Sequence, residues 1–265
     1  VVEVLDRILP AEDIDISNFA LKSFEKQGIK IKTSSMVKSL KTSKGKISVQ
    51  IETMAGSEEV SVEKVILAVG IIGNTENLGL ENTSAKVSNG QLVVDKWGAT
   101  HEPGLHAIGD LVGAPWLAHK ASHEGVICVE RIAGVENVHP LDSSNIPGCT
   151  YSRPQVASVG LTQKLAEDAG YKVRVGHFPF IGNGKAIALG EMDGFVKTVF
   201  NAATGELLGA HMIGAEVTEM IQGYTVARTL ETTENELLNT VFPHPTLSEM
   251  MHESVLDAFD RAIHI

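Results

Sequence analysis

The chain of 265 residues has few cysteines and no long apolar run. Its two cysteines, Cys128 and Cys149, lie far apart, and neither belongs to a C-x-x-C or C-x4-C pair. This argues against a disulfide scaffold or a zinc ribbon and favours a reducing compartment, so we expect a cytoplasmic protein. No apolar run approaches the ~20 residues needed to cross a bilayer. No signal peptide opens the chain, and we expect no membrane association.

Positive charge is also scarce. The chain has 22 Lys and Arg against 33 Asp and Glu, which gives a net charge of −11 and a pI near 5.4. Nucleic acid and anionic membrane surfaces are therefore not expected as partners. The apolar fraction of 43% and the charged fraction of 21% are typical of a globular protein with a substantial core. The length allows one large domain or two ordinary ones.

The first residues form a strand pattern, Val1 to Leu5, with an acidic residue, Glu3, inside the apolar run. In dinucleotide-binding βαβ units an acidic residue ends the second strand and holds the adenosine ribose. The chain lacks the G-x-G-x-x-G that should lie about twenty residues earlier. Glu3 is therefore either a ribose ligand or a solvated residue at the end of a strand.

The pattern after Glu3 predicts the later part of a nucleotide-binding domain. The expected elements are a helix over 15–28 that stops at Gly28, strands over 29–37 and 47–53, and a hairpin-like turn closed by residues 57–60. Residues 64–70 form a continuous apolar run ending in Gly70, which is typical of a strand buried on both faces. A glycine there lets a ligand approach the backbone closely.

A second candidate ligand site follows a short apolar strand predicted over 105–108. Gly109 and Asp110 come directly after it, and a helix is predicted over 117–134. Asp110 would lie at the carboxyl edge of a sheet, where open α/β sheets bind ligands, although an isolated Gly-Asp is mostly structural. His119 and His123 have a spacing that can chelate a metal. No third ligand is near and H-E-x-x-H is absent, so we expect no metal site.

A polar turn over 142–148 predicts a domain boundary. Beyond it, strands and helices segregate, which predicts an α+β domain with a sheet on one side. The expected strands are 156–161, 172–178, 195–200 and 207–213, and the expected helices are 162–170, 215–229, 233–241 and 246–261.

Near the C-terminus, His244 lies between two prolines and Glu249 follows five residues later. Prolines stiffen the turn, and a carboxylate close to imidazole fixes its orientation and favours its protonated form. This predicts an acid/base pair. Thr246 and Glu249 also match a T-x-x-E capping box, which predicts a plain helix start. Both interpretations stay open at this level.

Five segments together resemble the C-terminal part of the flavin-dependent pyridine-nucleotide disulfide oxidoreductases, nearest to their lipoamide branch. They are Val2 to Pro10, Leu105-His-Ala-Ile-Gly-Asp110, Leu117-Ala-His-Lys-Ala121, Tyr151-Ser-Arg-Pro154 with Val156 to Leu161, and His244-Pro-Thr-Leu-Ser-Glu249. The resemblance covers essentially the whole chain and little more than half of a family member. It implies the C-terminal part of an NAD-binding domain at 1–72, a central FAD-domain segment at 73–146 and a complete α+β dimerisation (interface) domain at 147–265.

The resemblance also implies roles for single residues. For FAD, Asp110 would bond a ribityl hydroxyl, and the backbone of Leu117, Ala118 and His119 would lie against the flavin. For NAD, the contacts would come from Glu3 and Gly70. Glu249 would orient His244. His244 would be the base that takes a thiol proton from dihydrolipoamide in the other subunit's active site. The implied partners are a second copy, forming a homodimer, and the lipoyl domains of 2-oxo acid dehydrogenase complexes.

The chain departs from the family pattern in two respects. Ile71, Ile72 and Gly73 stand where the family usually has Arg and then Pro, which puts one NAD contact in doubt. The redox cysteine pair and both G-x-G-x-x-G motifs are absent from this chain, so we expect it to be inactive alone. Two alternatives stay open: a non-catalytic dimerisation module, and a fragment of another branch of the flavoprotein disulfide reductases.

Overall fold

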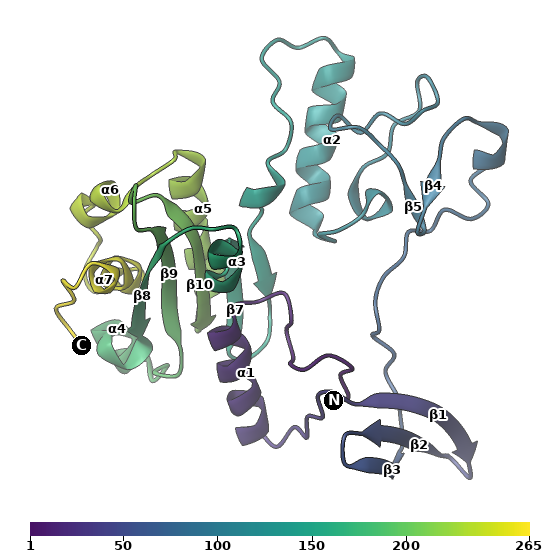
Figure 1. Ribbon diagram of the computed structural model, residues 1–265, viewed down its shortest axis with the longest axis horizontal. Helices are drawn as coiled ribbons and strands as arrows, with labels where there is room; N and C mark the ends of the chain where they lie inside the picture. Colours follow the sequence, from purple (N-terminus) through teal and green to yellow (C-terminus); the bar gives the residue numbers. More distant parts are fainter. The chain divides into compact units, whose positions relative to one another are not determined.

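The computed structural model describes residues 1–265, which divide into two compact units (Figure 1). One unit joins Val1–Val65 with Ser144–Ile265, and the other is Ile66–Ser143. The architecture is mixed α/β and α+β, as the sequence predicts. The predicted domain limits at 72 and 146 stay a prediction, because packing alone does not assign domains.

A five-stranded antiparallel sheet in the order β6-β7-β10-β9-β8 dominates the first unit. Its strands are β6 (Gly148–Thr150), β7 (Gln155–Gly160), β8 (Val173–Pro179), β9 (Phe195–Asn201) and β10 (Leu207–Gly214). Every residue of β10 is buried, because neighbouring strands flank it and helices cover both faces. The four predicted strands are confirmed, and the short β6 was not predicted.

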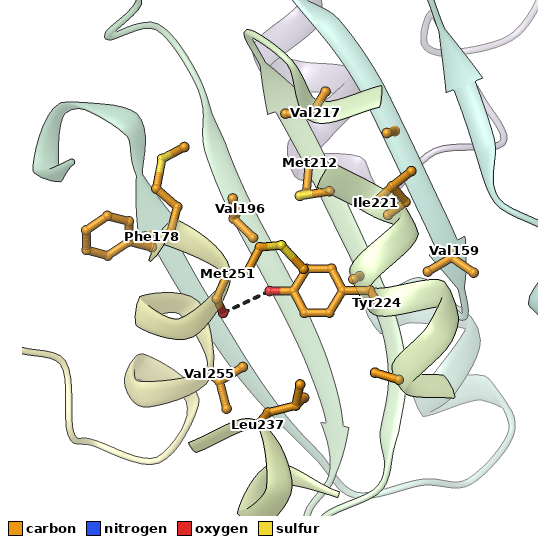
Figure 2. Packing of buried hydrophobic residues seen from close by; sticks show 14 of the residues in the cluster. Val159, Phe178, Val196, Met212, Val217, Ile221, Tyr224, Leu237, Met251 and Val255 are labelled. Carbon is orange, nitrogen blue, oxygen red and sulfur yellow. Dashed lines mark hydrogen bonds between the residues drawn. The ribbon is translucent and has the colours of Figure 1, made fainter. Parts of the chain in front are cut away.

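Alternate residues of the central strands point to two different cores. Val196 and Met212 pack with helices α5 (Val217–Thr229) and α7 (Glu249–Ala258) around the buried Tyr224 (Figure 2). The Tyr224 hydroxyl donates to the Met251 carbonyl at 2.9 Å, which satisfies this buried polar group. The adjacent residues Phe195 and Ile213 pack instead against α1 (Ile14–Lys26).

Three short helices complete this part of the unit: α3 (Gln163–Asp168), α4 (Gly184–Leu189) and α6 (Glu234–Asn239). Thr162 caps α3 by accepting from the Leu165 amide, and Thr233 with Glu236 forms a full capping box at α6. These local caps fix where α3 and α6 begin, and both helices were predicted. Single-turn 3₁₀ helices are η1 (Leu80–Asn82), η2 (Gly109–Val112), η3 (Ser143–Asn145) and η4 (Phe180–Gly182).

The start of the chain forms α1 and a three-stranded antiparallel sheet. The strands are β1 (Met36–Ser43), β2 (Lys46–Thr53) and β3 (Gly56–Val62), which confirms the predicted hairpin. The segments predicted as strands at 1–5 and 29–37 lie side by side but form no regular strand before Met36. An isolated parallel bridge joins Val2 to Lys32, and the amides of Ser34 and Ser35 donate to the carbonyls of Leu5 and Glu3. The buried ammonium of Lys197 on β9 lies 2.8 Å from Asp13 and 2.6 Å from Asp15, which anchors the N-terminus of α1 to the large sheet.

The strand predicted over 64–70 is absent. These residues are irregular, and Ile66, Leu67 and Val69 are 90, 79 and 87% exposed. A strand buried on both faces needs a hydrogen-bonded neighbour and a covering layer. Within residues 1–265 no segment supplies either, so the apolar pattern is present without the structure it predicts.

The second unit is small. It contains the two-stranded sheet of β4 (Val87–Ser88) and β5 (Gln91–Leu92), the turn η2, and helix α2 (Ala118–Ile132). The helix predicted over 117–134 is confirmed, whereas the strand predicted over 105–108 reduces to a single bridge between Ala99 and His106. No helix of the structure is long and apolar enough to span a membrane.

Candidate functional site

His244 and Glu249 form a hydrogen-bonded pair at the start of α7. The ring nitrogen Nδ1 of His244 lies 2.9 Å from Oε1 of Glu249. The other carboxylate oxygen, Oε2, accepts from the Thr246 amide at 2.8 Å. One carboxylate therefore holds both the imidazole and the turn that carries it.

The predicted capping box forms only in part. Glu249 accepts from the Thr246 amide as the motif requires, but the Thr246 hydroxyl donates to the Pro243 carbonyl at 2.6 Å. The helix begins at Glu249, and its N-cap, Ser248, makes no side-chain capping bond. Because Glu249 is the first helical residue and not the third, its carboxylate is directed to the turn and to His244.

The pair has the electrostatics of a general base. An ionised carboxylate can only accept, so Nδ1 of His244 carries the proton and Nε2 keeps its lone pair. The imidazole is 80% exposed, which leaves Nε2 accessible to another molecule. Partial burial raises the pKa of Glu249, but hydrogen bonds from the Thr246 amide and His244, together with nearby histidine charge, outweigh burial and hold that pKa below its ordinary value. Glu249 thus stays ionised and stabilises an imidazolium when His244 takes a proton.

Asn183 supports the turn from outside it and was missed by the sequence analysis. Its amide nitrogen donates to the Thr246 carbonyl at 3.1 Å, and its amide oxygen accepts from the Ala186 amide as the cap of α4. Asn183 is buried, so both contacts are shielded from water. An Asn-Gly pair signals a turn in the sequence, but no local signal connects it to a residue more than sixty positions later.

In the other unit, Asp110 lies on η2 with an exposed side chain. The preceding Gly109 has φ +74°, and a Cβ built there would lie 3.1 Å from the Cβ of Ala121 on α2. Glycine therefore allows both the left-handed turn and its close approach to the helix. Helix α2 begins at Ala118, and its N-cap Leu117 supplies no side-chain cap. The Asp110 carboxylate and the start of α2 thus lie within one unit.

Lys120 and Glu124 of α2 also belong to this region, although no motif in the sequence singles them out. The Lys120 ammonium is 2.8 Å from Oε1 of Glu124 and 3.1 Å from the Gly113 carbonyl. Oε2 of Glu124 accepts from the Gly109 amide at 2.7 Å. The i, i+4 spacing of the pair is visible in the sequence, whereas its contacts with the turn are not.

The predicted NAD contacts do not meet within one unit. The Glu3 carboxylate accepts from the Leu5 amide at 2.8 Å. Glu3 also borders a cavity of about 490 Å³, which is lined in addition by Phe24, Ile31 and Arg153. Gly70 has φ +141° in the exposed segment of the other unit. Their NAD roles therefore stay predictions. No group of three or more His, Cys, Asp or Glu side chains has a metal-binding arrangement in residues 1–265.

Comparison with known proteins covers nearly the whole chain. Two family models match, the pyridine nucleotide-disulphide oxidoreductase model at residues 1–125 and the dimerisation domain of the same family at residues 146–255. The dihydrolipoyl dehydrogenase of Zymomonas mobilis is 56% identical over all of this chain, and that of Rhizobium etli is 55% identical. The chain spans 57% and 55% of the lengths of these two curated relatives.

Solved structures agree on the fold. LpdA from Mycobacterium tuberculosis has a TM-score of 0.88 at 27% identity, with 96% of this chain and 55% of that protein covered. The HOCl-induced flavoprotein disulfide reductase RclA from Escherichia coli has a TM-score of 0.87 at 23% identity, with 96% of this chain and 58% of that protein covered. At that identity the second likeness concerns the fold alone.

Proposed function

The chain belongs to the pyridine nucleotide-disulphide oxidoreductase family, and from this premise we propose that it is the C-terminal part of a dihydrolipoyl dehydrogenase. The complete protein would oxidise protein-bound dihydrolipoamide and reduce NAD⁺. The observation that carries the proposal is the His244–Glu249 pair, with an ionised carboxylate on Nδ1 and an accessible Nε2. The high identity to named dihydrolipoyl dehydrogenases supports the lipoamide branch over other disulfide reductases.

In this proposal His244 is the general base. Its Nε2 takes the proton from a thiol of dihydrolipoamide, and the thiolate that results is the nucleophile for disulfide exchange. Glu249 stabilises the imidazolium and keeps the ring oriented through Nδ1. Because the turn is held by Glu249 and Asn183, the base is placed before the substrate arrives.

Residues of the second unit fit a flavin. The exposed Asp110 carboxylate suits a ribityl hydroxyl, and Gly109 keeps its turn close to the helix. The backbone of Leu117, Ala118 and His119, at the start of α2, would lie against the flavin ring. FAD, when bound, would supply a two-electron acceptor between the dithiol and NAD⁺. Glu3, beside its cavity, would hold the NAD ribose, and Gly70 would approach the same cofactor.

The test uses the full-length protein that contains this chain. We expect His244→Ala to lower turnover with dihydrolipoamide by more than ~10²-fold, because the base is lost. His139→Ala, which changes an exposed histidine, is the control and keeps wild-type turnover. Turnover that survives His244→Ala would defeat the assignment of the base. We also propose that the 265-residue chain alone does not turn over, and a dihydrolipoamide assay of that chain checks this directly.

We further propose a homodimer formed through the dimerisation domain. A largely apolar groove of about 930 Å³ runs along α5 and α6, where Val226 and Leu230 are exposed. A second copy is the occupant that the family match at 146–255 supports. Sedimentation at micromolar concentration is expected to show a dimer that Leu230→Asp weakens. Leu189→Asp, on α4 and outside the groove, is the matched control.

The remaining parts of the proposal concern partners and location. Lipoyl domains of 2-oxo acid dehydrogenase complexes would present the substrate, and a cytoplasmic location agrees with the two free cysteines. The alternative of a non-catalytic dimerisation module rests on the same family match. Visible flavin absorbance that stays with the purified 265-residue chain would exclude that alternative.

A further inference from the structure

One face of α2 holds the turn that carries Asp110 at two points. Glu124 accepts from the Gly109 amide at 2.7 Å, on the N-terminal side of Asp110. Lys120 donates to the Gly113 carbonyl at 3.1 Å, on its C-terminal side, and approaches the Gly109 carbonyl at 3.4 Å. The residue with the exposed carboxylate therefore lies between two residues that the helix holds.

Close packing prevents the turn that carries Asp110 from moving nearer to α2. A Cβ at Gly109 would lie 3.1 Å from the Cβ of Ala121, and a Cβ at Gly125 would lie 3.1 Å from Cδ1 of Ile108. The Gly109 backbone and the Ile108 side chain thus lie close to α2. Contact limits its approach to the helix, and the polar bonds of Lys120 and Glu124 limit its departure.

The polar groups of this pair bond the turn and each other. The three N–H groups of the Lys120 ammonium face the Gly109 carbonyl, the Gly113 carbonyl and Glu124, and the two Glu124 oxygens face Lys120 and the Gly109 amide. Lys120 is only 6% exposed. A buried ion pair is weak support for stability, since well-packed apolar residues often serve as well. Its bonds to the turn give it a positional role instead.

We propose that Lys120 and Glu124 are positioning residues, which fix the η2 backbone so that the Asp110 carboxylate is presented to the ribityl chain of a flavin. The inference rests on the proposed function for the identity of the ligand. The inference goes beyond the proposed function because it assigns the fixed conformation of the η2 turn to two side chains that do not touch the ligand. Their effect on flavin binding passes through Gly109 and Gly113.

The test measures flavin affinity and amide exchange in the full-length protein. Glu124→Ala and Lys120→Met are each expected to weaken flavin binding about tenfold, as loss of outer-shell supports typically does. Glu124→Gln keeps an oxygen for the Gly109 amide and is expected to retain most of the affinity. Hydrogen exchange at the Gly109 amide of the flavin-free protein is expected to be faster in Glu124→Ala. Lys164→Met, in the exposed i, i+4 ion pair of α3, is the matched control.

The outcomes separate this inference from the proposed function. If Asp110→Asn weakens flavin binding but Glu124→Ala and Lys120→Met stay within twofold of wild type, the positioning role is overturned. If Asp110→Asn leaves the affinity unchanged, the flavin role of Asp110 fails, and the exchange rate at Gly109 still tests whether Glu124 holds the turn. Unchanged exchange in Glu124→Ala overturns that role as well. Where Glu124→Ala fails to fold, Lys120→Met carries the comparison, with Glu124→Gln as the variant that keeps an acceptor for the Gly109 amide.

Discussion

Two apolar stretches of this chain differ in structure and burial. Residues 207–214 form β10 and are buried without exception, whereas residues 64–70 are irregular and exposed along their whole length. Both have the sequence of a strand covered on two faces. β10 has β7 and β9 beside it, α5 on one face and α1 on the other, and the second stretch has none of these. Burial of an apolar segment lowers its free energy, but the segment is buried only where neighbouring strands and helices cover it.

The largest expected effect lies in the buried sheet. Phe200 on β9 is fully buried in the main core and contacts the ring of Phe259 edge-on. Phe200→Ala is expected to lower the free energy of unfolding by about 3–5 kcal/mol through lost burial and a cavity. Urea unfolding followed by circular dichroism measures it. A loss below ~1 kcal/mol would mean that the core relaxes around the missing ring.

The second prediction concerns the charge that anchors α1 to the sheet. Lys197→Met removes the partner of the buried Asp13 and is expected to cost about 3 kcal/mol, because Asp13 is left as an unpaired buried charge. Burial raises the pKa of Asp13, but bonds and charge from Lys197 outweigh it and set the pKa below its ordinary value. The stability from this pair is therefore present above the unfolded pKa and lost as pH falls through the folded one. The free energy of unfolding, measured between pH 7 and pH 2, should fall less with decreasing pH in the variant than in the wild-type protein.

Glu12 should show the opposite pH dependence. Burial raises its pKa, a bond with Ser158 opposes the rise and the charge of Asp13 adds to it, so the folded pKa lies above the unfolded one. Stability from this group is present below the unfolded pKa and lost as pH rises through the folded pKa. Glu12→Gln is therefore expected to stabilise the protein at pH 7 and to have little effect at pH 3. Destabilisation at pH 7 would contradict the assigned shift.

The smallest effect is expected in the exposed stretch. Leu67→Ser should change the free energy of unfolding by no more than ~0.5 kcal/mol, because the side chain is 79% exposed. The same urea titration as for Phe200→Ala makes the two values directly comparable. A cost of more than ~2 kcal/mol in this chain would remove the contrast between the two stretches.

Much of the fold could be predicted because its signals are local. Helical periodicity and caps indicate α1, α2, α5 and α6, and alternation or continuous apolar runs indicate β7 to β10. The short α4 was missed because it begins at an Asn-Gly pair, Asn183 and Gly184, which signals a turn in the sequence. The His244–Glu249 contact could be predicted because five positions and two prolines hold the residues near each other. The contact between Glu124 and the Gly109 amide spans fifteen positions and has no local signal.

The sequence by itself determined most of the helices, the strands β7 to β10, the turn that carries His244, and the set of motifs that identifies the family. Those features depend on side-chain periodicity, proline geometry and caps, which act over a few residues. Only the tertiary structure decided that α1 packs on the β9–β10 face through Lys197, that Lys120 and Glu124 hold the turn of Asp110, and that residues 64–70 form no strand. Burial and long-range hydrogen bonds depend on which segments meet, and that is a property of the folded chain as a whole.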